Sequence, residues 1–472
     1  MIPVMLLIGV LGMPIAMSIW LILMEDGPPG GVRRAVGLTA GSVALCALGL
    51  LPFAGQTTPF SVTWLPTAGA LRLSLGATSL YSVAATALAA AALFLLPTAG
   101  PGVRGRTGAV VLLALMAGNL AFLADHFLLR YAALEVAGLC IAGAPLLAGT
   151  GRDRVGQATH VYVLLRFGDA GMLIAVLLLG RAGTLEIAPA LANFAALEGA
   201  AGTWVVGGFF LAVAVKLGLW PFHTWMRPGA LSSRAVHAWL YATLMPNLGL
   251  YLLYRVAPLP AANPLLRTAL LGAGLASGAI TAWALWRYPD PALRAVRLTA
   301  LLHSLVWSLA LLLEARIAWW GLLALSAIRL PLYLRSGRTE AVTERAPARE
   351  PAWDGSLRRL ARWIYAGVET GGLERLVGGM STGLGGLARW LYTHVERGTL
   401  GEGLESLTQR TVAVTEETYG AVEGGLEGLF HTVARGVLAG SARLRRWHSG
   451  RLRANLWWLI ACLVLALFWV LY

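Results

Sequence analysis

The sequence contains almost no lysine and little charge of any kind. Of its 472 residues 13% are charged and 57% are hydrophobic, and among the 37 basic residues a single one, Lys216, is lysine. Soluble domains carry about 25% charged residues, so this composition excludes an ordinary soluble fold. What the sequence has instead is a series of apolar runs of about 20 residues, the length at which a helix crosses ~30 Å of hydrocarbon.

Cysteine is also scarce. Cys46, Cys140 and Cys462 lie far apart inside apolar segments, without the paired spacing that zinc or iron–sulfur sites require. The sequence lacks a glycine-rich dinucleotide-binding fingerprint too, so we expect no metal, no disulfide, no cofactor and no redox chemistry in this polypeptide. The formal charge of +14 comes from arginines spread over short loops rather than from one basic patch, so nucleic acid is not an expected partner.

The apolar runs predict an all-α fold, a polytopic transmembrane helix bundle of about 12 spans. Arginines gather in alternate loops, and basic loops stay in the cytoplasm, so we expect both termini on the outer, periplasmic side of the cell inner membrane. No basic residue precedes the first run and no cleavage site follows it, which favours a retained span over a signal peptide. The predicted spans are residues 2–24, 35–54, 76–97, 108–124, 127–148, 159–180, 203–222, 235–255, 266–286, 298–313, 316–334 and 454–472.

The chain divides into three predicted parts. Residues 1–337 form the transmembrane bundle, 338–453 a cytoplasmic-side linker and amphipathic helical arm, and 454–472 a C-terminal transmembrane anchor. In the middle part charges of both signs appear and apolar residues recur at helical spacing. Its many glycines weaken a single straight helix, so we expect several helical pieces. The apolar face of the arm would bind neighbouring membrane subunits or lipid headgroups.

Lys216 stands inside one of the predicted spans. Arginine keeps its proton under physiological conditions, whereas a lysine ammonium in poorly solvated surroundings can lose its own. A lysine in this place indicates proton transfer, with a static interhelical ion pair as the alternative. Glu135, also inside a predicted span, is its expected partner, because a buried carboxylate needs a cation. Moving the carboxylate toward or away from the amine would then control the proton.

Short motifs surround these two residues. They are Ala124-Asp125 ahead of Glu135, Arg166-Phe-Gly-Asp169, and Lys216 followed by Pro221-Phe-His223-Thr-Trp225. The arginine and aspartate of the second motif are three residues apart, so their charges can pair on one helical face. In this order the motifs resemble those of the antiporter-like, proton-conducting membrane subunits of respiratory complex I and of multi-subunit Na⁺/H⁺ antiporters. The resemblance implies that Glu135 and Lys216 match the family's key glutamate and channel lysine.

Beyond Trp225 the resemblance weakens. Counted from that tryptophan, the family's next histidine falls on Tyr241, while His237 lies four residues earlier on the same helical face. A membrane histidine there is either a proton carrier or a satisfied structural group. In the second half Arg329 stands where the family has a lysine, and arginine does not readily pass a proton on. We count these three polar residues as candidates for the proton path, and infer that the second half is shortened or degenerate.

Three functions fit these patterns. The first is a proton-translocating, non-redox membrane subunit of a complex I-like assembly, such as an NADH–quinone oxidoreductase or a related hydrogenase, working through the Glu135–Lys216 pair. The second is a subunit of a multi-subunit Na⁺/H⁺ antiporter. The third is a membrane scaffold or proton-path subunit of an inorganic-carbon uptake complex, which the shortened second half favours. In each of them the expected partners are other membrane subunits and the lipid bilayer. The arm and terminal span resemble the lateral helix and anchor of the most distal complex I subunit.

Overall fold

The computed structural model describes residues 2–23, 29–55, 57–65, 69–96, 103–148, 154–197, 200–226, 233–287 and 291–336. All of them belong to one compact unit, Met1–Gly378. The predicted arm at 338–453 and the predicted anchor at 454–472 lie outside the described residues.

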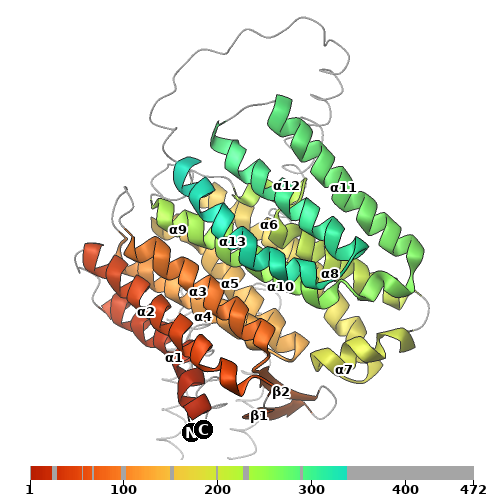
Figure 1. Ribbon diagram of the computed structural model, residues 1–472, viewed down its shortest axis with the longest axis horizontal. Helices are drawn as coiled ribbons and strands as arrows, with labels where there is room; N and C mark the ends of the chain where they lie inside the picture. Colours follow the sequence, from red (N-terminus) through yellow and green to blue (C-terminus); the bar gives the residue numbers. More distant parts are fainter. Residues whose placement is uncertain are drawn as a thin grey trace, which may run out of the picture. The chain divides into compact units, whose positions relative to one another are not determined.

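The described part is an all-α polytopic helix bundle, as the sequence predicts (Figure 1). Nine of its helical segments are long and apolar enough to cross a membrane. Runs of leucine, alanine and valine form them because in hydrocarbon every backbone N–H and C=O must bond within its own helix. These segments are built on α1 (Ile2–Leu23), α2 (Pro29–Gly49), α3 (Ala77–Leu95), α4 (Gly105–Leu123), α5 (Phe127–Ala148), α6 (Arg154–Leu179), α8 (Ala201–Leu217), α11 (Pro264–Arg287) and α12 (Pro291–Leu312).

Two further predicted spans, 235–255 and 316–334, are also helical. The first contains a π-helical turn, in which the Met245 N–H bonds to the Leu240 carbonyl. Pro246 follows directly, and because proline has no N–H to offer, the regular helical ladder cannot continue through this point. The segments are α9 (Arg234–Trp239), the π turn η5 (Leu240–Leu244), α10 (Met245–Val256) and α13 (Arg316–Ser336).

A two-stranded antiparallel hairpin lies between α2 and α3, where the sequence analysis predicted no element. Its strands are β1 (Thr57–Leu65) and β2 (Gly69–Ser74), and β1 is rich in the β-branched and aromatic residues that favour strands. Short pieces complete the fold: η1 (Leu51–Phe53), η2 (Gly180–Ala182), α7 (Ile187–Ala192), η3 (Asn193–Ala196), η4 (Phe222–Met226) and η6 (Leu259–Ala262).

Burial differs strongly among the helices. In α4, 89% of the apolar segment is buried inside the bundle, against 22% in α11, which stands at the edge next to α12 (Figure 1). In the centre, α6 packs on α5 along one side and on α8 along another. Helix α6 therefore lies between the two helices that carry Glu135 and Lys216.

The contact between α6 and α8 is unusually close at Gly208. A Cβ added to this residue would overlap the backbone carbonyl oxygen of Gly171 on α6. Small residues at helix interfaces let backbones approach within membranes, where association depends on packing rather than on hydrophobic burial. About two turns further along α8, the side chain of Lys216 comes within reach of Asp169 on α6.

Candidate functional site

Lys216 is fully buried in the last turn of α8. Its Nζ donates a hydrogen bond to Oδ1 of Asp169, and the two groups form an ion pair. Asp169 comes from α6 and its side chain is 2% exposed. A buried ammonium and a buried carboxylate are each strongly disfavoured alone, so each stabilises the other's burial.

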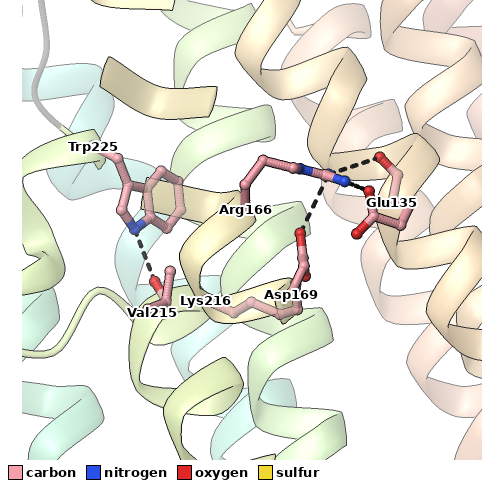
Figure 2. Close-up of polar contacts among 6 residues, drawn as sticks. All are labelled: Glu135, Arg166, Asp169, Val215, Lys216 and Trp225. Atoms are coloured by element: carbon pink, nitrogen blue, oxygen red, sulfur yellow. Dashed lines mark hydrogen bonds and ion pairs between the residues drawn. The ribbon is translucent and has the colours of Figure 1, made fainter. Parts of the chain in front are cut away.

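Arg166 lies one turn earlier on α6 and connects this pair to α5. Its Nη2 is 3.2 Å from Oδ2 of Asp169, and its Nη1 forms an ion pair with Glu135 (Figure 2). The same guanidinium also bonds the Glu135 backbone carbonyl at 3.3 Å and lies over the Tyr162 ring. The result is a chain of four alternating charges, Glu135–Arg166–Asp169–Lys216, which we call the charge relay.

The sequence analysis expected Glu135 to pair directly with Lys216, and the structure corrects this. Asp169 binds the ammonium, and Arg166 binds Glu135. The physical reason is the position of α6 between α5 and α8. The motif that the sequence analysis treated as a supporting pair therefore supplies the two central members of the relay.

Exposure falls along the relay. The side chains of Glu135 and Arg166 are each 18% exposed, whereas those of Asp169 and Lys216 are 2% and 0% exposed. The relay thus begins at the surface of the described bundle and ends in its core. Neutralising Glu135 would change the electrostatic potential at Lys216, although Arg166 and Asp169 lie between them. The reason is that Coulomb interactions are only weakly screened in the buried, poorly solvated part of the bundle.

The Pro-Phe-His-Thr-Trp motif forms the turn η4, which follows α8 and holds it in place. Trp225 Nε1 donates to the Val215 carbonyl at 2.8 Å, next to Lys216. Pro221 directly precedes this turn. His223 is buried within it, and Thr224 Oγ1 lies 3.0 Å from Nε2 of His160 on α6.

His237 and Tyr241 stack on each other, with ring centroids 4.9 Å apart. Tyr241 donates its hydroxyl to the Ile141 carbonyl of α5 at 3.0 Å, and its ring lies 5.9 Å from that of Trp225. The two candidate residues are therefore joined to the site around Lys216 through Trp225. Their spacing of one turn, read from the sequence, is the reason for the stack.

Arg329, the candidate from the second half, is fully buried on α13. It contacts Asn247 of α10 and His303 of α12. Asn247 was missed by the sequence analysis, because a single asparagine in an apolar helix has no motif around it. Together they form a second buried polar cluster on α10, α12 and α13.

Asp125 does not join the relay. It lies in the turn between α4 and α5, where its backbone N–H donates to the Arg72 carbonyl of β2 and its carbonyl accepts from Ile187 of α7. Its carboxylate is 3.9 Å from Arg255. Burial raises the pKa of the Asp125 carboxyl, and the nearby Arg255 and Arg130 guanidinium groups offset only part of this. The backbone of the motif aspartate therefore links the hairpin to α7, while its buried carboxylate is only partly compensated by the nearby arginines.

Asp125→Asn tests the cost of burying this carboxylate through its pH dependence. Since the pKa of this carboxyl is higher in the folded protein than in the unfolded chain, the ionised carboxylate weakens folding at neutral pH, and the penalty is lost as the pH falls through the acid range. We expect the variant to melt at a higher temperature than the parent at pH 7, with the difference shrinking toward pH 4. Glu314→Gln, at a side chain that is 61% exposed, is the control. A lower melting temperature for Asp125→Asn at pH 7 would contradict the assignment.

Among the residues that the structure describes, no three His, Cys, Asp or Glu side chains gather into a set that could hold a metal ion. The candidate site consists of the charge relay, the η4 turn and the stacked rings of His237 and Tyr241.

Comparison with known proteins gives one family and several solved structures. The profile of a family described as "NADH:quinone oxidoreductase/Mrp antiporter, TM" matches residues 124–286, which contain the whole charge relay. No curated protein sequence matches the chain significantly.

Three solved structures share the fold. The membrane-bound sulfane sulfur reductase, an archaeal respiratory membrane complex, is 17% identical with a TM-score of 0.56, covering 70% of this chain and 56% of its own. The Mrp complex from Dietzia sp. DQ12-45-1b is 21% identical with a TM-score of 0.62, covering 77% and 41%. Respiratory complex I from Thermus thermophilus is 22% identical with a TM-score of 0.58, covering 85% and 87%. The chain thus spans about half the length of the first two.

Proposed function

We propose that the chain is an antiporter-like membrane subunit of the complex I and Mrp type, and that it moves protons by means of Lys216. The observation that carries the proposal is the burial of the chain's single lysine at the inner end of an alternating charge relay. A lysine can hold and release a proton, whereas the arginines that make up the rest of the basic residues cannot.

The relay offers a physical switch. Asp169 is shared between Arg166 and Lys216. When Glu135 is neutralised or drawn away, the Arg166 guanidinium loses one of its two carboxylate partners and binds Asp169 more strongly. The ammonium of Lys216 then loses most of its compensation and releases its proton, because its charged form is no longer favoured in the buried site. Restoring Glu135 pulls Arg166 back, and Lys216 takes up a proton again.

The outer end of the relay points to a partner. Glu135 and Arg166 are partly exposed within segments that cross the membrane, and charged groups facing hydrocarbon are costly. We propose that another membrane subunit covers them and that its state sets the position of Glu135. The complex would be of the NADH–quinone oxidoreductase or membrane hydrogenase type, in a cell inner membrane, with both termini on the outer side.

The second candidate is a subunit of a multi-subunit Na⁺/H⁺ antiporter, which the family profile favours equally, since its description covers Mrp antiporters as well. The same relay would then couple proton movement to a sodium gradient. Proton flux that responds to an imposed sodium gradient, without any electron donor, would select this candidate.

Substitution of Lys216 tests the proposal. The complex that contains the chain is purified with Lys216→Ala or Lys216→Arg and placed in liposomes, and proton uptake is followed with a pH-sensitive dye. We expect both variants to assemble and to lose transport about a hundredfold, the scale of effect that one proton-transferring group has. Lys216→Arg is the sharper of the two, since it keeps the charge that holds Asp169 and removes only the capacity to lose a proton.

Arg316→Ala is the matched control. Its side chain is 73% exposed and pairs only locally with Glu314, so its transport should equal that of the parent. Parent-like transport by both Lys216 variants in a fully assembled complex would refute proton movement through Lys216 and support a scaffold role.

A further inference from the structure

One histidine near the beginning of α6 takes no part in the charge relay. His160 lies in the second turn of this helix, six residues after Arg154. Among the five histidines that the structure describes, only His160 is partly exposed, and the other four are buried. Histidine is the one side chain that ordinarily changes its charge between about pH 5 and pH 8, so at the surface of a protein it can exchange protons with water.

This end of α6 reaches the surface of the described bundle. Arg154, Val155 and Gly156 are exposed, and Arg152 precedes the helix in the sequence. Basic residues beside a membrane helix mark its cytoplasmic end. On the proposed topology His160 therefore lies about two helical turns from the water on the inner side of the membrane.

The hydrogen-bond partner of His160 allows the imidazole to change its protonation. Nε2 of His160 lies 3.0 Å from the hydroxyl oxygen of Thr224 in η4. A hydroxyl can donate to a bare ring nitrogen and can accept from a protonated one, so the contact fits both neutral tautomers and the imidazolium. The buried His126 differs, because its Nδ1 accepts from the Leu128 backbone N–H at 3.2 Å, and protonation of that nitrogen would break the bond. His160 can thus gain and lose a proton without losing Thr224.

The turn that binds His160 lies against the helix end that carries Lys216. Turn η4 packs on α6, α8 and α12. Gly218, two residues after Lys216, ends α8 in the left-handed conformation with φ +60°. A Cβ added to Gly218 would lie 3.3 Å from Cα of His223 in η4. The contact between His160 and Thr224 therefore joins the outer part of α6 to the immediate surroundings of the lysine.

Few other groups at this end of α6 could carry a proton. The last two turns of α5, residues 141–148, contain no titratable side chain. The other charged or titratable residues on the first turns of α6, and on α8 and η4 packed against it, are Arg154, Tyr162, Lys216 and His223. Arginine and tyrosine ordinarily keep their protons at neutral pH, and His223 is buried. His160 is therefore the partly exposed group here that is suited to proton exchange.

Resting on the proposed function, we propose that His160 is the residue through which Lys216 exchanges protons with the water at the beginning of α6. The imidazole takes a proton from this water, passes it inward and returns to its neutral form. Thr224 is a positioning residue that holds the ring against η4. From His160 to Asp169, the partner of Lys216, α6 rises about 14 Å over nine residues. One proton transfer spans a single hydrogen bond, so water and hydroxyl groups carry the proton over the rest of this distance.

Substitution of His160 tests the assignment. The intact complex is placed in liposomes and energised as for the Lys216 variants. We expect His160→Gln to slow transport roughly tenfold, less than the ~10²-fold effect of a proton-transferring group that nothing can replace, because water near the surface takes over part of its role. His160→Glu should be slowed much less, since glutamate has the size of glutamine but can hold and release a proton.

Imidazole added to the solution gives a readout that a structural role would not change. It should bring His160→Gln to within about twofold of the parent, because it replaces the missing proton carrier. Charge movement is followed with a voltage-sensitive dye, since imidazole crosses membranes and would dissipate a pH difference. Thr224→Val is the matched control: it removes the same hydrogen bond with a side chain of the same shape, so it should slow transport less than His160→Gln and gain nothing from imidazole.

Two results would overturn the assignment. One is parent-like transport by His160→Gln in an assembled complex. The other is a loss in His160→Gln that neither glutamate at this position nor imidazole relieves, because His160 would then matter only for structure. Lys216→Ala, measured in parallel, separates this inference from the proposed function. If Lys216→Ala is inactive and His160→Gln is parent-like, only the role of His160 fails, whereas an active Lys216→Ala refutes proton movement through Lys216 whatever His160 does.

Discussion

Asp169→Leu is expected to lower the free energy of unfolding by ~3–5 kcal/mol, because it leaves the buried Lys216 ammonium without its carboxylate. Lys216 has no exposure to water through which the loss could be relieved. The variant should also fail to transport protons, since nothing then holds the proton on Lys216. Unfolding in detergent, followed by circular dichroism, measures the first effect, and dye-detected uptake in liposomes the second.

The double variant Asp169→Leu/Lys216→Leu separates stability from transport. Replacing both members of a buried ion pair with apolar groups is often neutral or stabilising, so the double variant should regain most of the lost stability. It should still not transport. A double variant that is as unstable as Asp169→Leu alone would contradict the pairing of these two residues.

Much of the fold could be predicted from the sequence because the bilayer restricts the choice. A run of ~20 apolar residues has one stable form in hydrocarbon. For this reason the predicted spans between residues 2 and 334 coincide with the nine apolar helical segments and with the helices around Pro246 and Arg329, whereas the span predicted at 454–472 lies outside the described residues. The hairpin at 57–74 was missed because a search for long apolar runs does not register a short strand pair.

The partners within the site could not be predicted as well as its members. Glu135, Arg166, Asp169 and Lys216 were all found from their motifs and their place in apolar runs. Their pairing depends on how each helix is rotated, and from Val205 to Leu217 helix α8 is apolar on every side except at Lys216. Such a helix has no polar face to orient it, so nothing in the sequence distinguished Glu135 from Asp169 as the nearer acid.

What orients α8 in the structure is the close packing at Gly208, and this leads to the second large effect. Gly208→Val places a branched side chain against the Gly171 carbonyl, which is backbone and cannot rotate away. The two helices must separate or turn, and overpacking of this kind costs about 3 kcal/mol when no flexible side chain gives way. Because Asp169 and Lys216 meet across the same interface, we expect the variant to lose proton transport as well.

The neighbouring residue provides the control. Gly207 lies on the exposed side of α8, and a Cβ added there would meet nothing within 4 Å. Gly207→Val makes the same chemical change one position away, so it should alter the unfolding free energy by no more than about 1 kcal/mol and leave transport intact. Equal losses in the two variants would mean that valine weakens α8 as a helix wherever it is placed. A loss confined to Gly208→Val would instead show that the distance between α6 and α8 sets the pairing on which the charge relay depends.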